Sequence, residues 1–362
     1  MELLQPKPTK RIVELDALRA LAAINLMLFH FTHVYSVKYG YTSDLGFEFP
    51  FGKYGVQLFF MLSGFVNAMT LLKKRDTKGF LANRAVRILP IYFVVVGINL
   101  VLLWVAPINQ HTSADTATIL ANLTLVPNLL GYPCLEPATW TLQVEVLFYA
   151  ILATVFLSGG PKHNRRVWLC YLLLCLVGCR LIPAGEVGTP FTFAQTVREL
   201  LLLEYMPLFI IGMFLEHLRF QNGKLLPTLI GIVLAATVFH LTDIHGHNPA
   251  ATVLLTGILA MAAYGRLPIL RIRPLVFIST ISYSLYLLHD NLGSVIIYHL
   301  NQNGVPPIVC FIVIIPLVVL LSWLSTRLLE RPLSQIVRRI LRLPTSAKPA
   351  FVSTSTAPEA LR

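Results

Sequence analysis

Charged side chains are scarce in this sequence. Only 13% of its 362 residues are Asp, Glu, Lys or Arg, whereas 56% are hydrophobic and the mean hydropathy is +0.69. A soluble domain carries about 25% charged residues, so this composition excludes a soluble globular protein. The long apolar runs instead predict an all-α integral membrane protein, because a helix satisfies its own backbone hydrogen bonds in lipid.

Three further features that the sequence lacks narrow the class of membrane protein. The five cysteines show no paired spacing, so we expect ordinary packing rather than a disulfide between Cys134 and Cys179. We find no internal repeat, although many secondary transporters contain inverted ones. The first apolar run is interrupted by Arg19 and lacks a small-residue cleavage site. It is therefore not expected to be a cleavable signal.

Ten apolar runs are long enough to cross about 30 Å of hydrocarbon. We place these spans at 17–35, 54–72, 88–106, 141–158, 167–182, 199–216, 226–241, 249–264, 276–299 and 306–329. With both termini in the cytoplasm, most of the 29 Lys and Arg residues collect in cytoplasmic segments, as the positive-inside rule requires.

This topology divides the chain into three parts: a cytoplasmic segment 1–11, a membrane domain 12–335 and a basic, then disordered cytoplasmic tail 336–362. The net charge of +12 accordingly reports topology and contact with anionic membrane lipid. We expect no nucleic-acid partner, because no soluble surface gathers the charge.

Two polar residues interrupt the first span. Arg19 and His30 are three helical turns apart, so both lie on one face, separated by about 16 Å along the axis. A charge in hydrocarbon costs about 3 kcal/mol or more, and we therefore interpret this face as a functional site rather than packing. A metal pair of His30 with His33 lacks a third ligand at suitable spacing, so we expect no metal.

Other spans carry polar residues at matching depths. The second and fourth spans begin outside, which places Gln57 and Glu145 level with His30, and Glu204 lies at a similar depth. At the opposite side, Arg84 and Arg87 open the third span. Separated by three residues, they share a face, as two cations that bind one phosphate group would need; the alternative is that they are plain positive-inside anchors.

These features occur in an order that resembles acyltransferase family 3, the integral membrane O-acyltransferases of lipopolysaccharide O-antigen, exopolysaccharide and related acceptors. The resemblance covers about residues 12–335. It rests on Arg19 with His30, the stretch 55–65, Arg84-Ala-Val-Arg87 followed by Pro90-Ile-Tyr92, the stretches 140–149 and 281–289, and Leu329-Glu330-Arg331-Pro332.

The resemblance implies a multi-pass protein of the bacterial cytoplasmic (inner) membrane. It places acyl-coenzyme A on the cytoplasmic side near Arg84 and Arg87, and makes His30 essential with Arg19 as its partner. Two positions depart from the family pattern. Gln57 stands where many members have Asp, and Val146 follows Glu145 where many have a second acid.

We therefore expect transfer of an acyl group, most simply acetyl from acetyl-coenzyme A, to a hydroxyl of an extracytoplasmic glycan or glycolipid. His30 acts either as the base or as the covalent acyl carrier, and Glu145 orients its ring. His289, next to Asp290, either pairs structurally or lines the tunnel. Weaker candidates for lining the substrate path are Gln57, Ser63, Trp140, Tyr149, Glu204, Tyr286 and His289.

One function of a different class stays open at this stage. A proton-coupled transporter of a sugar or small anion would use His30 and Glu145 as a proton relay. The missing repeat and the cytoplasmic arginine pair favour the acyltransferase. The acceptor, its hydroxyl, the acyl length and the oligomeric state are left open by the sequence.

Overall fold

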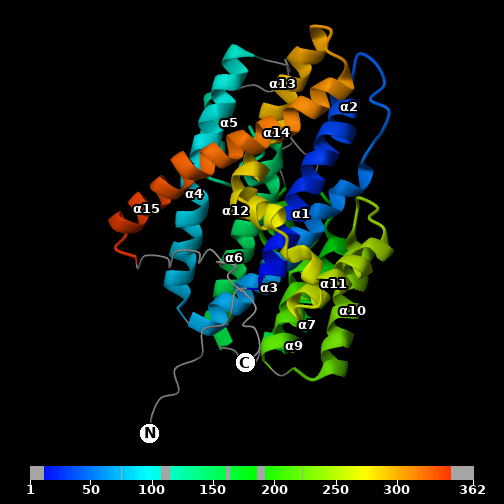
Figure 1. Ribbon diagram of the computed structural model, residues 1–362. Coiled ribbons are helices and arrows are strands. Elements are labelled where there is room, and N and C mark those ends of the chain that lie inside the picture. The colour runs from blue at the N-terminus through cyan, green and yellow to red at the C-terminus, as the bar shows by residue number, and fades with distance from the viewer. Residues whose placement is uncertain are drawn as a thin grey trace, which may run out of the picture.

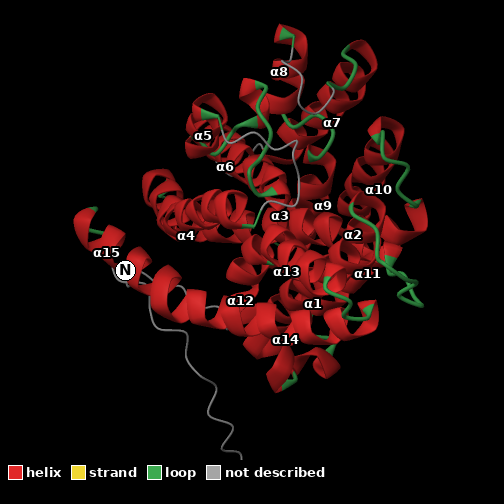
Figure 2. Cartoon of the chain, turned by 90° about the horizontal axis from the view of Figure 1, so that it is seen from above, coloured by secondary structure: helices red, strands yellow, loops and turns green. Residues whose placement is uncertain are grey.

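The computed structural model describes residues 12–74, 76–106, 115–159, 164–185, 192–221 and 223–343. The expected cytoplasmic segment 1–11 and the tail from 344 lie outside the described residues. Within the described ranges every regular element is a helix (Figure 2). The all-α prediction is therefore confirmed for the part of the chain that the structure describes.

The helices of the described residues are shown along the chain in Figure 1. Their bounds are α1 Val13–Phe29, η1 His30–Val34, α2 Tyr35–Lys38, η2 Pro50–Lys53, α3 Tyr54–Lys74, α4 Thr77–Val105, α5 Thr116–Leu123, η3 Asn128–Leu130, η4 Pro137–Thr139, α6 Trp140–Gly159, α7 Asn164–Leu181, α8 Phe193–Leu200, α9 Met206–Phe220, α10 Leu225–Thr242, α11 Pro249–Ala263, η5 Pro268–Arg271, α12 Arg273–Leu288, α13 Asp290–Gln302, α14 Pro307–Ser325, η6 Thr326–Glu330 and α15 Arg331–Ile340.

Six helical segments in the described residues are long and apolar enough to cross a membrane. They are Val13–Lys38, Pro50–Leu72, Thr77–Val105, Pro137–Ser158, Leu225–Thr242 and Pro307–Ile340, and α11 and α12 are shorter apolar helices. A multi-pass membrane protein is thus supported, whereas the count of ten spans and the cytoplasmic position of both termini stay predictions.

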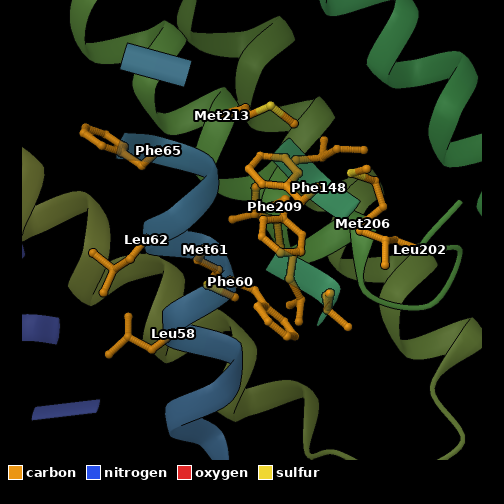
Figure 3. Packing of buried hydrophobic residues seen from close by; sticks show 14 of the residues in the cluster. Leu58, Phe60, Met61, Leu62, Phe65, Phe148, Leu202, Met206, Phe209 and Met213 are labelled. Carbon is orange, nitrogen blue, oxygen red and sulfur yellow. The ribbon is translucent and has the colours of Figure 1, made fainter. Parts of the chain in front are cut away.

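The centre of the bundle is a tight crossing of α3 and α9. A Cβ atom added at Gly64 would overlap the carbonyl oxygen of Phe209, and one added at Gly212 would overlap that of Met61. Small residues allow such close approach of helices in membranes. Beside the crossing, the ring of Phe209 stacks on Phe148 at 4.0 Å (Figure 3). This core holds α3, α6 and α9 in fixed relation.

The first span contains a π turn, η1, at His30–Val34. A π turn is a local bulge in an α-helix that is often found at functional sites, and it changes which side chains share a face. Here it begins at His30. The regular period of 3.6 residues therefore applies up to His30. Beyond His30 a different set of side chains shares each face.

The span expected at 276–299 is divided in two at His289. Helix α12 ends at Leu288 and α13 begins at Asp290. Nδ1 of His289 lies 2.8 Å from the carbonyl oxygen of Tyr286, the oxygen that the amide of Asp290 would use in an uninterrupted helix. At the break, the His289 side chain thus competes with the Asp290 amide for this backbone oxygen. His289 and Asp290 therefore stand at the junction of two helices.

Candidate active site

A cavity lies among α1, α3, α4, α6 and α12 and encloses about 840 Å³, counting its solvent-open mouth. Its polar lining consists of Arg19, Ser63, Asn67, Arg84, Arg87, Thr141, Glu145, Tyr149, Ser282, Tyr283 and Tyr286. The structure therefore brings together the three arginines that the sequence singled out.

Glu145 is the carboxylate of this cavity. Its Oε1 accepts a hydrogen bond from Ser63 Oγ at 3.0 Å and another from the Tyr149 hydroxyl. The Arg84 guanidinium lies over the Tyr149 ring, 5.5 Å from its centroid, a cation–π contact that holds it in place. Three cations and a single acid thus line the cavity, and Arg19 also pairs with Asp16 at 3.5 Å. An excess of guanidinium groups suits a multiply charged anion such as a phosphate ester.

His30 has a different partner from the one expected. Its Nδ1 lies 3.2 Å from Oδ2 of Asp290, the distance of an ion pair, although the geometry is not that of an aligned hydrogen bond. Glu145, which the sequence placed at the same depth, lines the cavity instead. A carboxylate beside Nδ1 favours the tautomer that leaves Nε2 unprotonated. The structure therefore supplies His30 with a carboxylate partner from α13.

The His30 ring also contacts His289, with 4.8 Å between centroids. His289 lies in turn 5.7 Å from the ring of Tyr286, which lines the cavity. The Tyr286 hydroxyl donates to the carbonyl oxygen of Ala138 at 2.8 Å and is hydrogen-bonded with Thr141. Tyr286 therefore connects the arginine-lined cavity to the His30–His289 pair.

A second buried acid near Asp290 carries no sequence signal, because it stands in a loop. Glu136 is 2% exposed, and its Oε2 accepts from Asn99 Nδ2 at 3.3 Å. Asn99 Oδ1 in turn accepts from Asn291 Nδ2 at 2.6 Å. Burial raises the pKa of the Glu136 carboxyl well above its ordinary value, and the negative charge of Asp290 raises it further. Burial and the neighbouring carboxylate therefore favour the protonated form of Glu136.

Four of the weaker sequence candidates are absent from the cavity lining: His289, which lies beside Tyr286, and three residues with partners elsewhere. Gln57 Oε1 accepts from Thr252 Oγ1 at 3.1 Å, which ties α3 to α11. Trp140 packs against Tyr205, with 5.4 Å between ring centroids. Glu204 pairs with Arg198 at 3.5 Å. By contrast, Ser63, Tyr149 and Tyr286 line the cavity.

The histidines of the loop between α10 and α11 form local contacts. Asp243 Oδ1 lies 2.8 Å from His247 Nδ1, and His245 Nε2 lies 3.4 Å from Glu204 Oε1. Among the described residues no group of three or more His, Cys, Asp and Glu side chains could hold a metal ion.

A multi-pass helical protein with a partly buried histidine–carboxylate pair beside a cationic cavity has the parts of a membrane-embedded group-transfer enzyme. The family model described as an acyltransferase domain matches residues 12–327, and this chain belongs to that family, acyltransferase family 3. It is also 30% identical over 268 residues to the exopolysaccharide production protein ExoZ of Rhizobium meliloti (strain 1021), an alignment that covers 69% of this chain and 80% of ExoZ. No solved structure matches the chain significantly. The protein is therefore a membrane acyltransferase.

Proposed function

We propose that this protein transfers an acetyl group from acetyl-coenzyme A, bound from the cytoplasm, to a hydroxyl of an exopolysaccharide or related glycan outside the bacterial inner membrane. The observation that carries the proposal is the cavity with Arg19, Arg84 and Arg87 in its lining and Tyr286 beside the His30–His289 pair. The similarity to ExoZ supports an exopolysaccharide as the acceptor.

The arginines would bind the phosphates of coenzyme A. A guanidinium offers forked donors that match phosphate oxygens, and each charge-assisted bond contributes about 1.5–3 kcal/mol. Glu145 and Tyr149 would keep Arg84 in place, since Tyr149 donates to Glu145 and lies under the Arg84 guanidinium. In this proposal Glu145 orders the donor site rather than the imidazole of His30.

His30 would perform the transfer. Asp290 favours the tautomer with the proton on Nδ1, so Nε2 is free to take the proton of the glycan hydroxyl as its oxygen attacks the thioester carbonyl. Asp290 also stabilises the imidazolium that results. The same Nε2 would be the nucleophile in a route through an acylated histidine, and both routes require the His30–Asp290 pair.

The proposal is tested by mass spectrometry of surface glycans from cells with and without this protein. Loss of an acetyl-sized increment from one glycan is the expected result. Unchanged glycans together with altered uptake of a sugar or small anion would contradict it and favour a transporter. Purified protein mixed with labelled acetyl-coenzyme A and the acetyl-free glycan should then restore the increment.

A further inference from the structure

A buried ring nitrogen of His289 has no hydrogen-bond partner in the described part of the chain. His289 is 1% exposed, and its Nε2 is unpartnered there. Its Nδ1 lies 2.8 Å from the carbonyl oxygen of Tyr286 and 3.2 Å from that of Leu285. Because a carbonyl oxygen only accepts, Nδ1 carries the proton and Nε2 has the lone pair. Buried polar atoms are nearly always paired, so this lone pair requires an explanation.

His30 presents the same arrangement next to it. Its Nδ1 faces the Asp290 carboxylate at 3.2 Å, which leaves the lone pair on Nε2. The two rings are 4.8 Å apart and inclined by 32°. Two imidazolium ions at this separation would repel each other. The pair therefore accommodates one additional proton, which either ring can hold.

The two rings differ in their surroundings. His30 has a carboxylate partner on α13 that stabilises a proton on its ring. His289 has only backbone carbonyls at Nδ1 and lies beside Tyr286, which lines the arginine-lined cavity. Figure 1 shows α1 and α12, the helices that lead to these two residues, side by side. His289 is thus the histidine on the side of the proposed donor.

We propose that His289 is a second catalytic acid–base group, which protonates the thiolate that leaves coenzyme A. The proposal rests on the acyltransferase function proposed above. As the hydroxyl oxygen bonds to the thioester carbonyl carbon, its proton passes to Nε2 of His30. The carbon–sulfur bond then breaks and its electron pair stays on sulfur. The proton moves from His30 to Nε2 of His289 and from there to the sulfur, which leaves a free thiol, the ester and two neutral imidazoles.

The direction of this proton movement follows from ordinary basicities. Asp290 holds the proton on His30 while the attack proceeds. A departing alkyl thiolate has a conjugate-acid pKa of about 8.5, against about 6.5 for an imidazole, so the thiolate draws the proton away once it forms. Without His289 the thiolate must leave unprotonated or wait for water. The step that suffers is therefore the departure of the sulfur.

Two size-matched acetyl donors separate leaving-group protonation from a structural role. S-benzyl thioacetate releases a basic thiolate that needs a proton, whereas S-(4-nitrophenyl) thioacetate releases a weakly basic thiolate that does not. We expect His289→Asn to lower glycan acetylation from acetyl-coenzyme A and from the benzyl donor by about 10²-fold or more. Acetylation from the nitrophenyl donor should fall by less than about tenfold. Equal losses with both donors would overturn the proposal.

The controls make each outcome informative. His30→Ala should lose activity to the same extent with both donors, because the hydroxyl proton must be removed in either case. His33→Asn, at an exposed histidine, should keep its activity with both donors. His289→Gln provides a second polar variant. On the wild-type enzyme alone, the rate across a series of thioesters should depend only weakly on the basicity of the leaving thiol, and a steep dependence would contradict the proposal. If the wild-type enzyme acetylates the glycan with none of these donors, the proposal that has failed is the acyltransferase function and not the role of His289.

Discussion

Nδ1 of His30 lies 3.2 Å from Oδ2 of Asp290, so the π turn of the first span and the first residue of α13 together form a histidine–carboxylate pair. The two residues are far apart in sequence, and each stands where a helix departs from regularity. The predictions below follow from this pair and from the cavity beside it.

Replacement of Asp290 tests the pairing directly. Asp290→Asn keeps the size of the side chain but removes the charge that fixes the His30 tautomer and stabilises its imidazolium. We expect kcat to fall by about 10²–10⁴-fold, with binding of acetyl-coenzyme A unchanged in a calorimetric titration. Asp44→Asn, in a loop where Asp44 accepts from the amide of Gly46, is the control. A kcat within twofold of wild type in Asp290→Asn would exclude the pair from the mechanism.

The cationic part of the cavity is tested at Arg84 and Arg87. Each alanine substitution removes charge-assisted contacts worth about 1.5–3 kcal/mol, so affinity for coenzyme A should fall at least about tenfold. The measurement is the Kd of the purified variants for acetyl-coenzyme A. Arg165→Ala removes an exposed cation at the start of α7 and serves as the control. Unchanged binding by the double variant would reduce both arginines to topological anchors.

Glu145 should affect donor binding more than chemistry. Its carboxylate accepts from Ser63 and Tyr149 in the arginine-lined cavity, and Glu145→Gln keeps the size while it removes the charge. We expect a severalfold rise in KM for acetyl-coenzyme A, with kcat reduced less than about tenfold, because no proton transfer depends on this group. A loss of kcat as large as that of His30→Ala would instead show that Glu145 takes part in the proton transfer.

The buried Glu136 should make stability depend on pH. Its pKa is raised by burial and by Asp290, so the folded chain binds this proton more tightly than the unfolded chain. The free energy of unfolding therefore falls as pH rises above about 4.3, the ordinary glutamate value, toward the raised pKa. Glu136→Gln removes this titration.

Thermal unfolding in detergent at a series of pH values from about 4.3 upward measures the effect. Wild type should lose about 1–3 °C more per pH unit than Glu136→Gln. Asp115→Asn is the control, because hydrogen bonds from Thr118 lower the pKa of Asp115 below its ordinary value of 3.8, which already lies under this range. Parallel slopes for wild type and Glu136→Gln would show that Glu136 is ionised throughout.

The sequence predicts the helical membrane class because apolar composition dominates, but it does not determine the helix count. The apolar runs predicted spans at 167–182 and 199–216, but α7 carries charged residues and α9 has only 15 residues, so neither is among the six described helical segments long and apolar enough to cross a membrane. The π turn at His30 and the break at His289 are invisible to a hydropathy pattern, because both runs remain apolar through them.

The sequence could not identify the partner of His30, and the reason is geometric. Depth along the membrane normal fixes one coordinate of a side chain, whereas the rotation and neighbours of its helix fix the other two. Glu145, expected at the depth of His30, lies in the cavity with the arginines, and Asp290 occupies the position beside His30. Arg19, Arg84 and Arg87, which the sequence placed toward the same side of the membrane, line one cavity.

The most direct test of the central claim is acetyl transfer by purified His30→Ala in lipid nanodiscs. Labelled acetyl-coenzyme A and the acetyl-free glycan are supplied, and label on the glycan is counted. We expect a folded protein that binds acetyl-coenzyme A like wild type but transfers at about 1% of its rate or less, because loss of a general base or nucleophile costs about 10²–10⁴-fold. Wild-type transfer by a well-folded His30→Ala variant would contradict the assignment of the site.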